Sequence, residues 1–321
     1  MNAEIDANPV WHEGERVLQQ RAGVAEGLAA FGSRVIRDHM PMQHREFFAR
    51  LPWLVAGSVD TAGQPWASAL TGPAGFVQSP DERSLRIGAL PLPADPLRAS
   101  LLPGRPVGLL GIEPQTRRRN RANGAIGEVD ARGFTVQVRQ SFGNCPKYIQ
   151  AREPVLVERT PAPAARRASG MDAAARAIVA KADTFFIATA HPDAGGGLRS
   201  HGVDVSHRGG RPGFVRLDGA DGLAVPDFMG NSFFNTLGNI TLHPLAGLLF
   251  IDYESGDLLQ IGVRAELLWD GPEVAAFAGA ERLLKMRVVS VLHQPGALPL
   301  RWGSVERSPF LDGTGRWPEA A

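Results

Sequence analysis

The sequence is poor in cysteine, and this shortage excludes two kinds of structural cross-link. Cys145 is the single cysteine among 321 residues, so the chain can form no internal disulfide and no zinc site that needs several thiolates. Acidic residues are spread over the first fifteen positions, without a basic stretch followed by an apolar run. We therefore expect no secretory signal and place the protein in the cytoplasm.

Long apolar runs are missing as well, because no stretch reaches the roughly 18 uninterrupted apolar residues that a membrane-spanning helix needs. The 34 basic and 33 acidic side chains nearly cancel, which leaves a net charge of +1. Such a balance gives no global field that would gather nucleic acid or an anionic membrane. We expect a small-molecule ligand, no nucleic-acid or membrane partner, and local capture of any anionic group.

Several familiar motifs are absent. The sequence has no Gly-x-Ser-x-Gly nucleophile motif, and Gly195–Gly197 lacks the Gly-x-Gly-x-x-Gly pattern of dinucleotide sites. The eight histidines are scattered, without a His-Glu-x-x-His helix, so we expect no metal site. Arg117–Arg121 is basic, but it is short and has no interleaved aromatic residues, so we expect a solvated turn between strands.

Glycine and proline are abundant instead, with 37 and 25 residues, and they separate short runs rich in Val, Ile, Leu and Phe. This spacing favours many short strands joined by turns and predicts a mainly β fold, a β-barrel class with accessory helices. Helical periodicity is confined to three segments, Gly14–Asp38, Met171–Ala182 and Pro272–Leu284.

Two parts of the chain resemble each other in order. Leu54–Val59 matches Phe186–His191, and Gly108–Ile112 matches Gly247–Ile251. Tandem duplication explains these matches, although apolar strands between glycine-rich turns also look alike by chance.

We expect two domains, residues 1–158 with a leading helix and residues 171–321, joined by the Pro-, Ala- and Arg-rich linker Arg159–Gly170. Two small barrels packed side by side would cover each other's edge strands and form a cleft between them.

The segment Val205–Arg216 is the richest in groups that bind phosphate. It contains three arginines, Ser206 and His207, and glycines that allow a ligand to approach the backbone. Guanidinium groups suit phosphate because their N–H groups form a rigid fork. The alternative is an exposed basic turn between strands.

Two further segments concentrate polar side chains. Asn231, Asn235 and Asn239 lie four residues apart, so a helix would align their amides on one face, although caps and turns explain asparagines equally well. Lys147 and Tyr148 stand beside a thiol and two amides, which indicates either a site or a turn that closes the first domain.

These features resemble the FMN-binding split barrel of pyridoxamine 5'-phosphate oxidase-like proteins. The resemblance covers a first strand, an Arg-bearing second strand, an amide-rich loop and a further strand, at Thr184–Ala190, Arg211–Arg216, Asp227–Asn239 and Ala246–Asp252. The phrases that begin at Ser206 and Phe142 also look like those of a bacterial subgroup of uncharacterised flavin-nucleotide-binding proteins.

The resemblance implies FMN as the cofactor, with its phosphate on Arg211 and Arg216 and its ring beside Gly213 and Phe214. The family's oxidases carry a Ser, Arg and Lys cluster where this chain has Asn235-Thr-Leu, so it favours flavin binding over pyridoxal phosphate synthesis. The candidate cofactor-binding residues are Lys147, Tyr148, Ser206, His207, Arg208, Arg211, Pro212, Gly213, Phe214, Arg216, Asp227, Asn231, Asn235, Thr236 and Asn239.

The expected function is that of an FMN-dependent oxidoreductase acting on a small molecule, with the chain paired as a homodimer as one option. The competing class is a non-catalytic flavin- or haem-binding storage or sensor protein, in which His207 or His243 would be the axial ligand. A scaffold that has lost its ligand is a third class.

Overall fold

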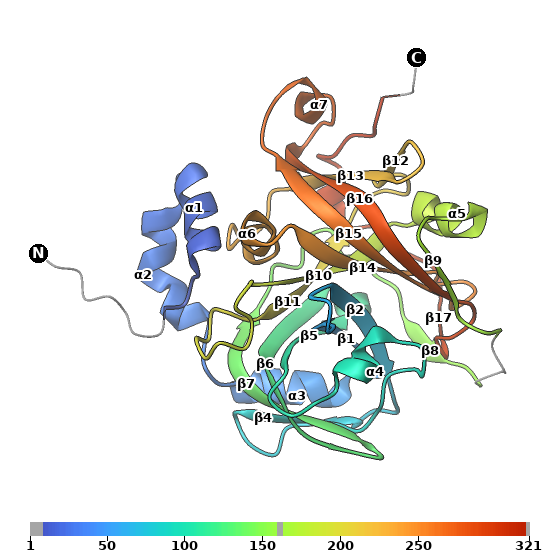
Figure 1. Cartoon of the computed structure of the whole chain (residues 1–321). Coiled ribbons are helices and arrows are strands. Elements are labelled where there is room, and N and C mark those ends of the chain that lie inside the picture. Colours follow the sequence, from blue (N-terminus) through green and yellow to red (C-terminus); the bar gives the residue numbers. More distant parts are fainter. Residues whose placement is uncertain (1–8, 159–162, 319–321) are drawn as a thin grey trace, which may run out of the picture.

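The computed structural model describes residues 9–158 and 163–318, and most of its strands lie in two antiparallel sheets (Figure 1). The strands of the first half are β1 (Trp53–Val59), β2 (Pro65–Thr71), β3 (Val77–Gln78), β4 (Ser84–Ile87), β5 (Pro106–Glu113), β6 (Arg118–Asp130) and β7 (Gly133–Gly143). Those of the second sheet are β9 (Arg166–Ala168), β10 (Thr184–Ala190), β11 (Val203–Gly209), β12 (Arg216–Asp218), β13 (Gly222–Phe228), β14 (Leu245–Ile251), β15 (Leu258–Leu268) and β16 (Ala280–Gln294). A separate pair joins β8 (Pro154–Leu156) to β17 (Leu300–Trp302).

The two sheets share one strand order. The first runs β2-β1-β5-β6-β7-β4-β3 and the second runs β11-β10-β14-β15-β16-β13-β12, with β9 added beside β16. The mainly β fold with two barrel-like halves is therefore confirmed. The exact domain limits stay a prediction, and residues 159–162 of the expected linker lie outside the described residues, as do residues 1–8 and 319–321.

Helices cover the ends and edges of the sheets (Figure 1). They are α1 (Glu13–Arg21), α2 (Ala25–Val35), α3 (Met42–Arg50), α4 (Pro96–Ser100), α5 (Ala173–Lys181), α6 (Asn235–Leu242) and α7 (Pro272–Ala275), with 3-10 turns at Pro114–Thr116 and Pro309–Leu311. The helices expected within residues 14–38 and 171–182 are thus present. Among these described residues, no helix is both long and apolar enough to cross a membrane.

The helix expected at Pro272–Leu284 is wrong over most of its length. Helix α7 ends at Ala275, and strand β16 begins at Ala280. The reason lies in the next residues, because Leu284, Met286 and Val288 alternate into the core of the second half with the two-residue period of a strand.

Each half has its own apolar core, and a third cluster joins them. Phe47, Phe48 and Phe134 are buried in the first core, whereas Phe185 and Phe250 are buried in the second. The joining cluster brings aromatic and aliphatic side chains of both sheets together, among them Trp53, Leu110, Phe186 and Leu249.

Two glycines allow the halves to approach closely. A Cβ at Gly108 would lie 2.5 Å from the carbonyl oxygen of Val203, and a Cβ at Gly247 would lie 2.2 Å from that of Pro65. Each glycine therefore sits against the backbone of the opposite half. These are also the first residues of the two matching phrases in the sequence.

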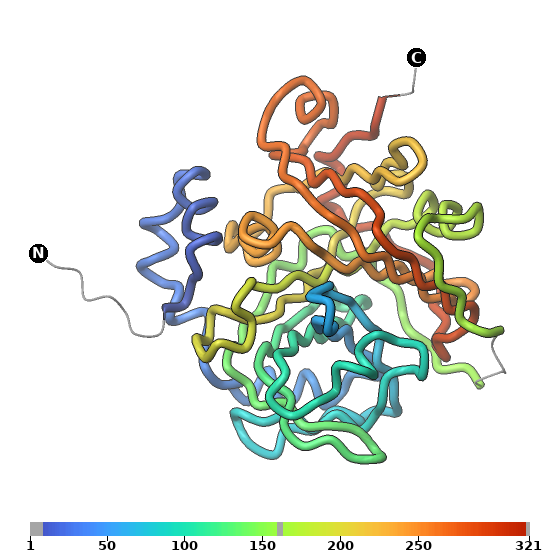
Figure 2. The backbone as a smooth tube through the Cα atoms, viewed as in Figure 1, coloured from blue at the N-terminus to red at the C-terminus, as the bar shows by residue number. Residues whose placement is uncertain are grey.

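Helix α1 packs beside α6 of the second half, away from the sheet of the first half (Figure 2). The contact is close, because a Cβ at Gly14 would lie 2.4 Å from the carbonyl oxygen of Gly238. Leu18 of the same helix joins the core of the second half. The leading helix thus covers the second barrel, although it precedes the first in the chain.

Candidate functional site: a cationic pocket between the two halves

A pocket opens where β6 and the segment after β7 meet β11, β13 and the start of α6. The space between its walls is about 880 Å³, counting the solvent at its open mouth. Its lining residues are Arg119, Arg121, Asn144, Cys145, Lys147, Tyr148, Ser206, His207, Arg208, Gly209, Phe214, Pro226, Asp227, Phe228, Gly230, Asn231, Ser232, Phe234, Asn235, Thr236, Leu237, Glu281 and Arg282. Both halves contribute, so the pocket needs the complete chain.

The lining is strongly cationic for a protein whose net charge is only +1. Four arginines and Lys147 face two carboxylates, Asp227 and Glu281, among the described lining residues. Charges in a concave, partly buried site attract a ligand of opposite sign more strongly than charges on an open surface do. The pocket is therefore suited to an anionic ligand.

Arg121 is the centre of a buried polar network. Its Nη1 donates to Asn235 Oδ1 at 2.7 Å and forms an ion pair with Asp204 Oδ1 at 2.8 Å, while Nη2 donates to Ser206 Oγ. The Ser206 hydroxyl lies 2.7 Å from the hydroxyl of Thr236. Burial lowers the pKa of Arg121. The nearby Asp204 carboxylate acts in the opposite direction, because its charge favours the protonated guanidinium.

Glu15 extends this network to helix α1. Its Oε1 accepts a 2.5 Å hydrogen bond from Asn235 Nδ2, and its Oε2 accepts the backbone N–H of His12 at 2.9 Å. Burial raises the pKa of this carboxyl group to about 8. The amide of Asn235 is thereby held from both sides, by Arg121 and by Glu15.

The solvated turn expected at Arg117–Arg121 is wrong for most of its length. Arg117 does follow a short turn, but β6 begins at Arg118 and carries Arg119 and Arg121 into the pocket. Arg119 Nε donates to the Cys145 carbonyl at 2.9 Å, and burial lowers the pKa of Arg119 to about 9. The sequence pattern does not reveal this strand, because one of its faces lines a polar site and the usual alternation of apolar and polar residues is missing.

A second group of charges lies around Asp227. The carboxylate accepts a hydrogen bond from Arg208 Nη1, and its Oδ2 lies 3.3 Å from Arg282 Nε. The Arg282 guanidinium also stacks over the rings of Phe234 and Trp269. Within the described chain, Arg208 Nε and Arg282 Nη1 are buried without a hydrogen-bond partner.

The backbone around the pocket is unusual. The described chain contains four non-glycine residues with positive φ, and Tyr148, Ser232 and Phe234 line this pocket. Such conformations cost about 1–3 kcal/mol each and cluster at functional sites. Phe234 precedes α6 and offers no side-chain cap, so the first N–H groups of that helix begin at the pocket wall.

Ten of the candidate residues named from the sequence line the pocket: Lys147, Tyr148, Ser206, His207, Arg208, Phe214, Asp227, Asn231, Asn235 and Thr236. The three asparagines do not share one face toward it. Asn231 Oδ1 instead accepts the N–H of Phe233, and Asn239 Nδ2 donates to Thr189 Oγ1 inside the protein.

The strand expected at Arg211–Arg216 is not formed, and its arginines lie outside the pocket lining. Strand β11 ends at Gly209, and the chain turns through Pro212 and Gly213, whose φ is +86°. Arg211 Nη2 donates to the Leu311 carbonyl near the C-terminus.

Arg216 is likewise committed elsewhere. It donates to the carboxylate of Glu273 and stacks over the ring of Trp317. The exposed basic turn that the sequence left as an alternative therefore describes residues 211–213 better than a strand does. The arginines of β6, together with Arg208 and Arg282, supply the pocket's guanidinium groups instead.

Of the two histidines considered as axial ligands, His207 lines the pocket and His243 does not. His207 is buried, and burial lowers its pKa well below the ordinary value of 6.5. Its imidazole is therefore neutral at physiological pH. Glu281 and Arg282 are lining residues without a sequence signal of their own, because the fold brings each of them there.

In the second sheet, the residue at the position that corresponds to Arg121 is Gln260. Arg121 pairs with Leu110, and Gln260 pairs with Leu249, the matching residue of the other phrase. Gln260 Nε2 donates to the Ala67 carbonyl at 2.8 Å and lies 3.2 Å from Asp95 Oδ2. Side-chain and backbone groups of the protein thus fill the place in the second sheet that corresponds to the site of Arg121.

Comparison with known proteins gives only distant matches. No family model and no curated protein matches the sequence. Among solved structures, HupZ from Group A Streptococcus is 13% identical with a TM-score of 0.29, covering 38% of this chain and 98% of that one.

Two other matches are of the same kind. A putative pyridoxamine 5'-phosphate oxidase from Lactobacillus delbrueckii is 14% identical with a TM-score of 0.30, covering 39% of this chain and 94% of that one. An F420 reductase is 14% identical with a TM-score of 0.25, covering 41% and 94%. The chain is thus distantly similar in structure to these solved proteins, each over about two fifths of its length.

Proposed function

We propose that this pocket binds FMN and that the chain is an FMN-dependent oxidoreductase acting on a small molecule. The observation that carries the proposal is the buried donor set around Arg121, which lies at the N-terminal end of α6 in a pocket rich in arginine. A helix N-terminus and guanidinium groups both favour a phosphate.

The phosphate would be held by Arg121, Ser206 and Thr236 together with the first N–H groups of α6. These side chains lie on three different elements and already contact one another, so their positions are fixed before a ligand binds. An anion would compete for them with the Asp204 carboxylate, which now pairs with Arg121 and accepts from Ser206. Buried guanidinium N–H groups without partners, at Arg208 and Arg282, are costly in a folded protein. An anionic ligand beside them would provide the missing acceptors.

The flavin ring would lie against the aromatic part of the lining. Tyr148 and Phe228 have ring centroids 5.0 Å apart, and Phe234, which directly precedes α6, also lines the pocket. Aromatic side chains contribute large apolar contact area to planar ligands. Tyr148 also donates a 3.3 Å hydrogen bond to the Met229 carbonyl, which holds its ring in place.

A bound flavin supplies the redox chemistry, namely the exchange of electron pairs with a substrate. The chain's own contribution is electrostatic. Lys147 and Arg208 stand in the lining, where they would stabilise negative charge that develops on the ligand. The neutral imidazole of His207 adds a polar group without adding charge.

The direct test is the absorbance spectrum of protein purified without added ligand, followed by mass analysis of what heating releases. A flavin spectrum and released FMN support the proposal. If the protein is colourless and does not take up added FMN, the proposal fails. Loss of uptake in Ser206→Ala, with unchanged thermal unfolding, would locate the ligand at this pocket.

One observation favours a second candidate, a non-catalytic haem-binding protein. His207 is neutral and lines the pocket, and neutral imidazole is the form that binds haem iron. Addition of haemin to the ligand-free protein distinguishes the two. A Soret band that disappears in His207→Ala supports haem binding, whereas FMN uptake without such a band supports the flavin.

A further inference from the structure

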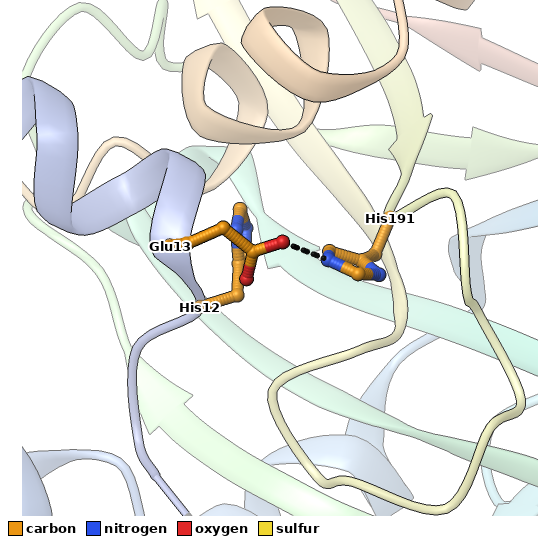
Figure 3. A group of neighbouring side chains, drawn as sticks. All are labelled: His12, Glu13 and His191. Atoms are coloured by element: carbon orange, nitrogen blue, oxygen red, sulfur yellow. Dashed lines mark hydrogen bonds and ion pairs between the residues drawn. The ribbon is translucent and has the colours of Figure 1, made fainter.

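A cluster of histidines and one carboxylate lies outside the pocket, where α1 meets the end of β10. His12, Glu13 and His191 each offer one ligand atom, and these atoms all lie within 4.8 Å of one another (Figure 3). His12 and His191 are buried, and Glu13 is half-exposed. The sequence gives no sign of this cluster because 178 residues separate Glu13 from His191.

We propose that His12, Glu13 and His191 bind one divalent transition-metal ion of the zinc type, with His201 beside them as a further ligand. Two imidazoles and a carboxylate form a donor set that suits zinc, cobalt or iron better than calcium or magnesium. Calcium and magnesium prefer sites built entirely from oxygen.

The hydrogen bonds of the rings show which atoms remain for an ion. Nδ1 of His12 accepts the backbone N–H of Gly14 at 3.2 Å, and Nδ1 of His191 accepts that of Asp193 at 3.0 Å. Nε2 is thus the nitrogen of each ring that accepts no backbone N–H and remains for an ion. Nε2 of His191 donates to Glu13 Oε1 at 3.2 Å, so this nitrogen already faces the carboxylate (Figure 3).

His12 provides an independent observation. Its side chain is 2% exposed, yet its Nε2 has no hydrogen-bond partner in the described chain. The Glu15 carboxylate lies 3.6 Å away, beyond hydrogen-bond distance. A buried ring nitrogen without a partner is uncommon and calls for a water or an ion.

His201 lies beside these three residues. Its ring stacks on His191 with centroids 3.7 Å apart, and its Nε2 lies 3.9 Å from Glu13 Oε2. Its other nitrogen, Nδ1, lies 3.4 Å from Asp193 Oδ2. A carboxylate on the far nitrogen is the usual partner of a metal-binding histidine, because it fixes the ring and its tautomer.

Binding has a structural consequence that can be followed. When Nε2 of His12 or His191 takes the ion, the ring proton moves to Nδ1 and the imidazole stays neutral. The N–H groups of Gly14 and Asp193 then lose their acceptors and must change partners. The ion would join α1 to the loop after β10, and α1 carries Glu15 to the pocket network.

The test is a calorimetric titration of the chelator-treated full-length protein with Zn²⁺. We expect one high-affinity equivalent per chain, and a loss of affinity of about tenfold or more in Glu13→Gln and in His191→Ala. His39→Ala is the matched control, because His39 pairs with Asp38 at 2.9 Å but belongs to no group of three metal-binding side chains within the described residues. That variant is expected to bind as the wild type does.

Glu13→Gln keeps the proposal falsifiable even if His191→Ala does not fold, because the Glu13 side chain is half-exposed. A wild type without saturable binding, or a Glu13→Gln variant that binds Zn²⁺ as tightly as the wild type, overturns the proposal. A second readout is amide NMR, in which the Gly14 and Asp193 signals are expected to shift with Zn²⁺ and to stay unchanged if the site is elsewhere.

Discussion

Arg121 and Asn235 share a 2.7 Å hydrogen bond although 114 residues separate them in the chain. Arg121 belongs to the first sheet, and Asn235 begins the helix α6 of the second half. The same guanidinium group also contacts Asp204 and Ser206, both on β11. One side chain therefore ties three elements together at the wall of the pocket.

Arg121→Lys is expected to weaken FMN binding by roughly tenfold to a hundredfold, because a hydrogen bond to a charged group contributes about 1.5–3 kcal/mol. Lysine keeps a cation beside Asp204 but loses the forked geometry. Quenching of flavin fluorescence on binding measures the affinity. Arg211→Lys is the matched control, since Arg211 bonds to Leu311 outside the pocket lining, and equal losses in both variants would contradict the assignment.

Because Glu15 is buried, we expect the free energy of unfolding to fall as the pH rises. Its pKa is about 8 in the folded protein against an ordinary value of 4.5, because the group is buried. Between these values the unfolded chain releases the proton and the folded chain keeps it, so unfolding becomes easier with increasing pH, by an amount on the order of 5 kcal/mol over the full range.

Glu15→Gln is expected to flatten this dependence, at a cost of about 1 kcal/mol for the bond that its amide nitrogen cannot accept from His12. Denaturant unfolding at a series of pH values measures it. Glu26→Gln on the exposed face of α2 serves as the control. A wild type and a Glu15→Gln variant with parallel pH profiles would refute the buried-carboxyl account.

Gly14→Ala is expected to destabilise the protein by about 1–3 kcal/mol, because overpacking forces backbone shifts. The new methyl group would lie 2.4 Å from the Gly238 carbonyl and 2.9 Å from Leu242 Cγ. Gly27→Ala lies in a helix with nothing within 4 Å and is expected to gain up to about 1 kcal/mol. Thermal unfolding separates the two, and equal effects would show that α1 does not press on α6.

The chain is expected to bind one FMN, although its two sheets share one strand order. Gln260 and Asp95 fill the location that corresponds to Arg121. The ratio of released flavin to protein measures the stoichiometry. Two equivalents per chain would mean that the protein groups at the second location move aside for a ligand.

The sequence predicts the fold class because glycine and proline mark short strands, and it predicts the repeat because Gly108 and Gly247 are both needed for close approach between the halves. It locates Ser206 and Arg208 because arginines and glycines gather there. It misses Arg121, whose strand has a polar face and no apolar alternation.

Other misses have the same physical origin. Arg282 lies in a strand that resembles a helix locally, and Glu15 reaches the pocket only because α1 packs on α6. Arg211 looks like a phosphate ligand, yet the C-terminal segment supplies its acceptor. Which partner a charged side chain finds depends on contacts that are distant in sequence.

The different fates of Arg121 and Gln260 have a consequence for how such a protein can change. In an assembly of two identical chains, every substitution appears at both copies of an interface. One copy therefore cannot bind a ligand while the equivalent copy is filled by protein side chains. A single chain that carries both halves is free of this constraint. The location of Arg121 can be adapted to a ligand while that of Gln260 is adapted to holding the two halves together. A substitution at one location then leaves the other unchanged.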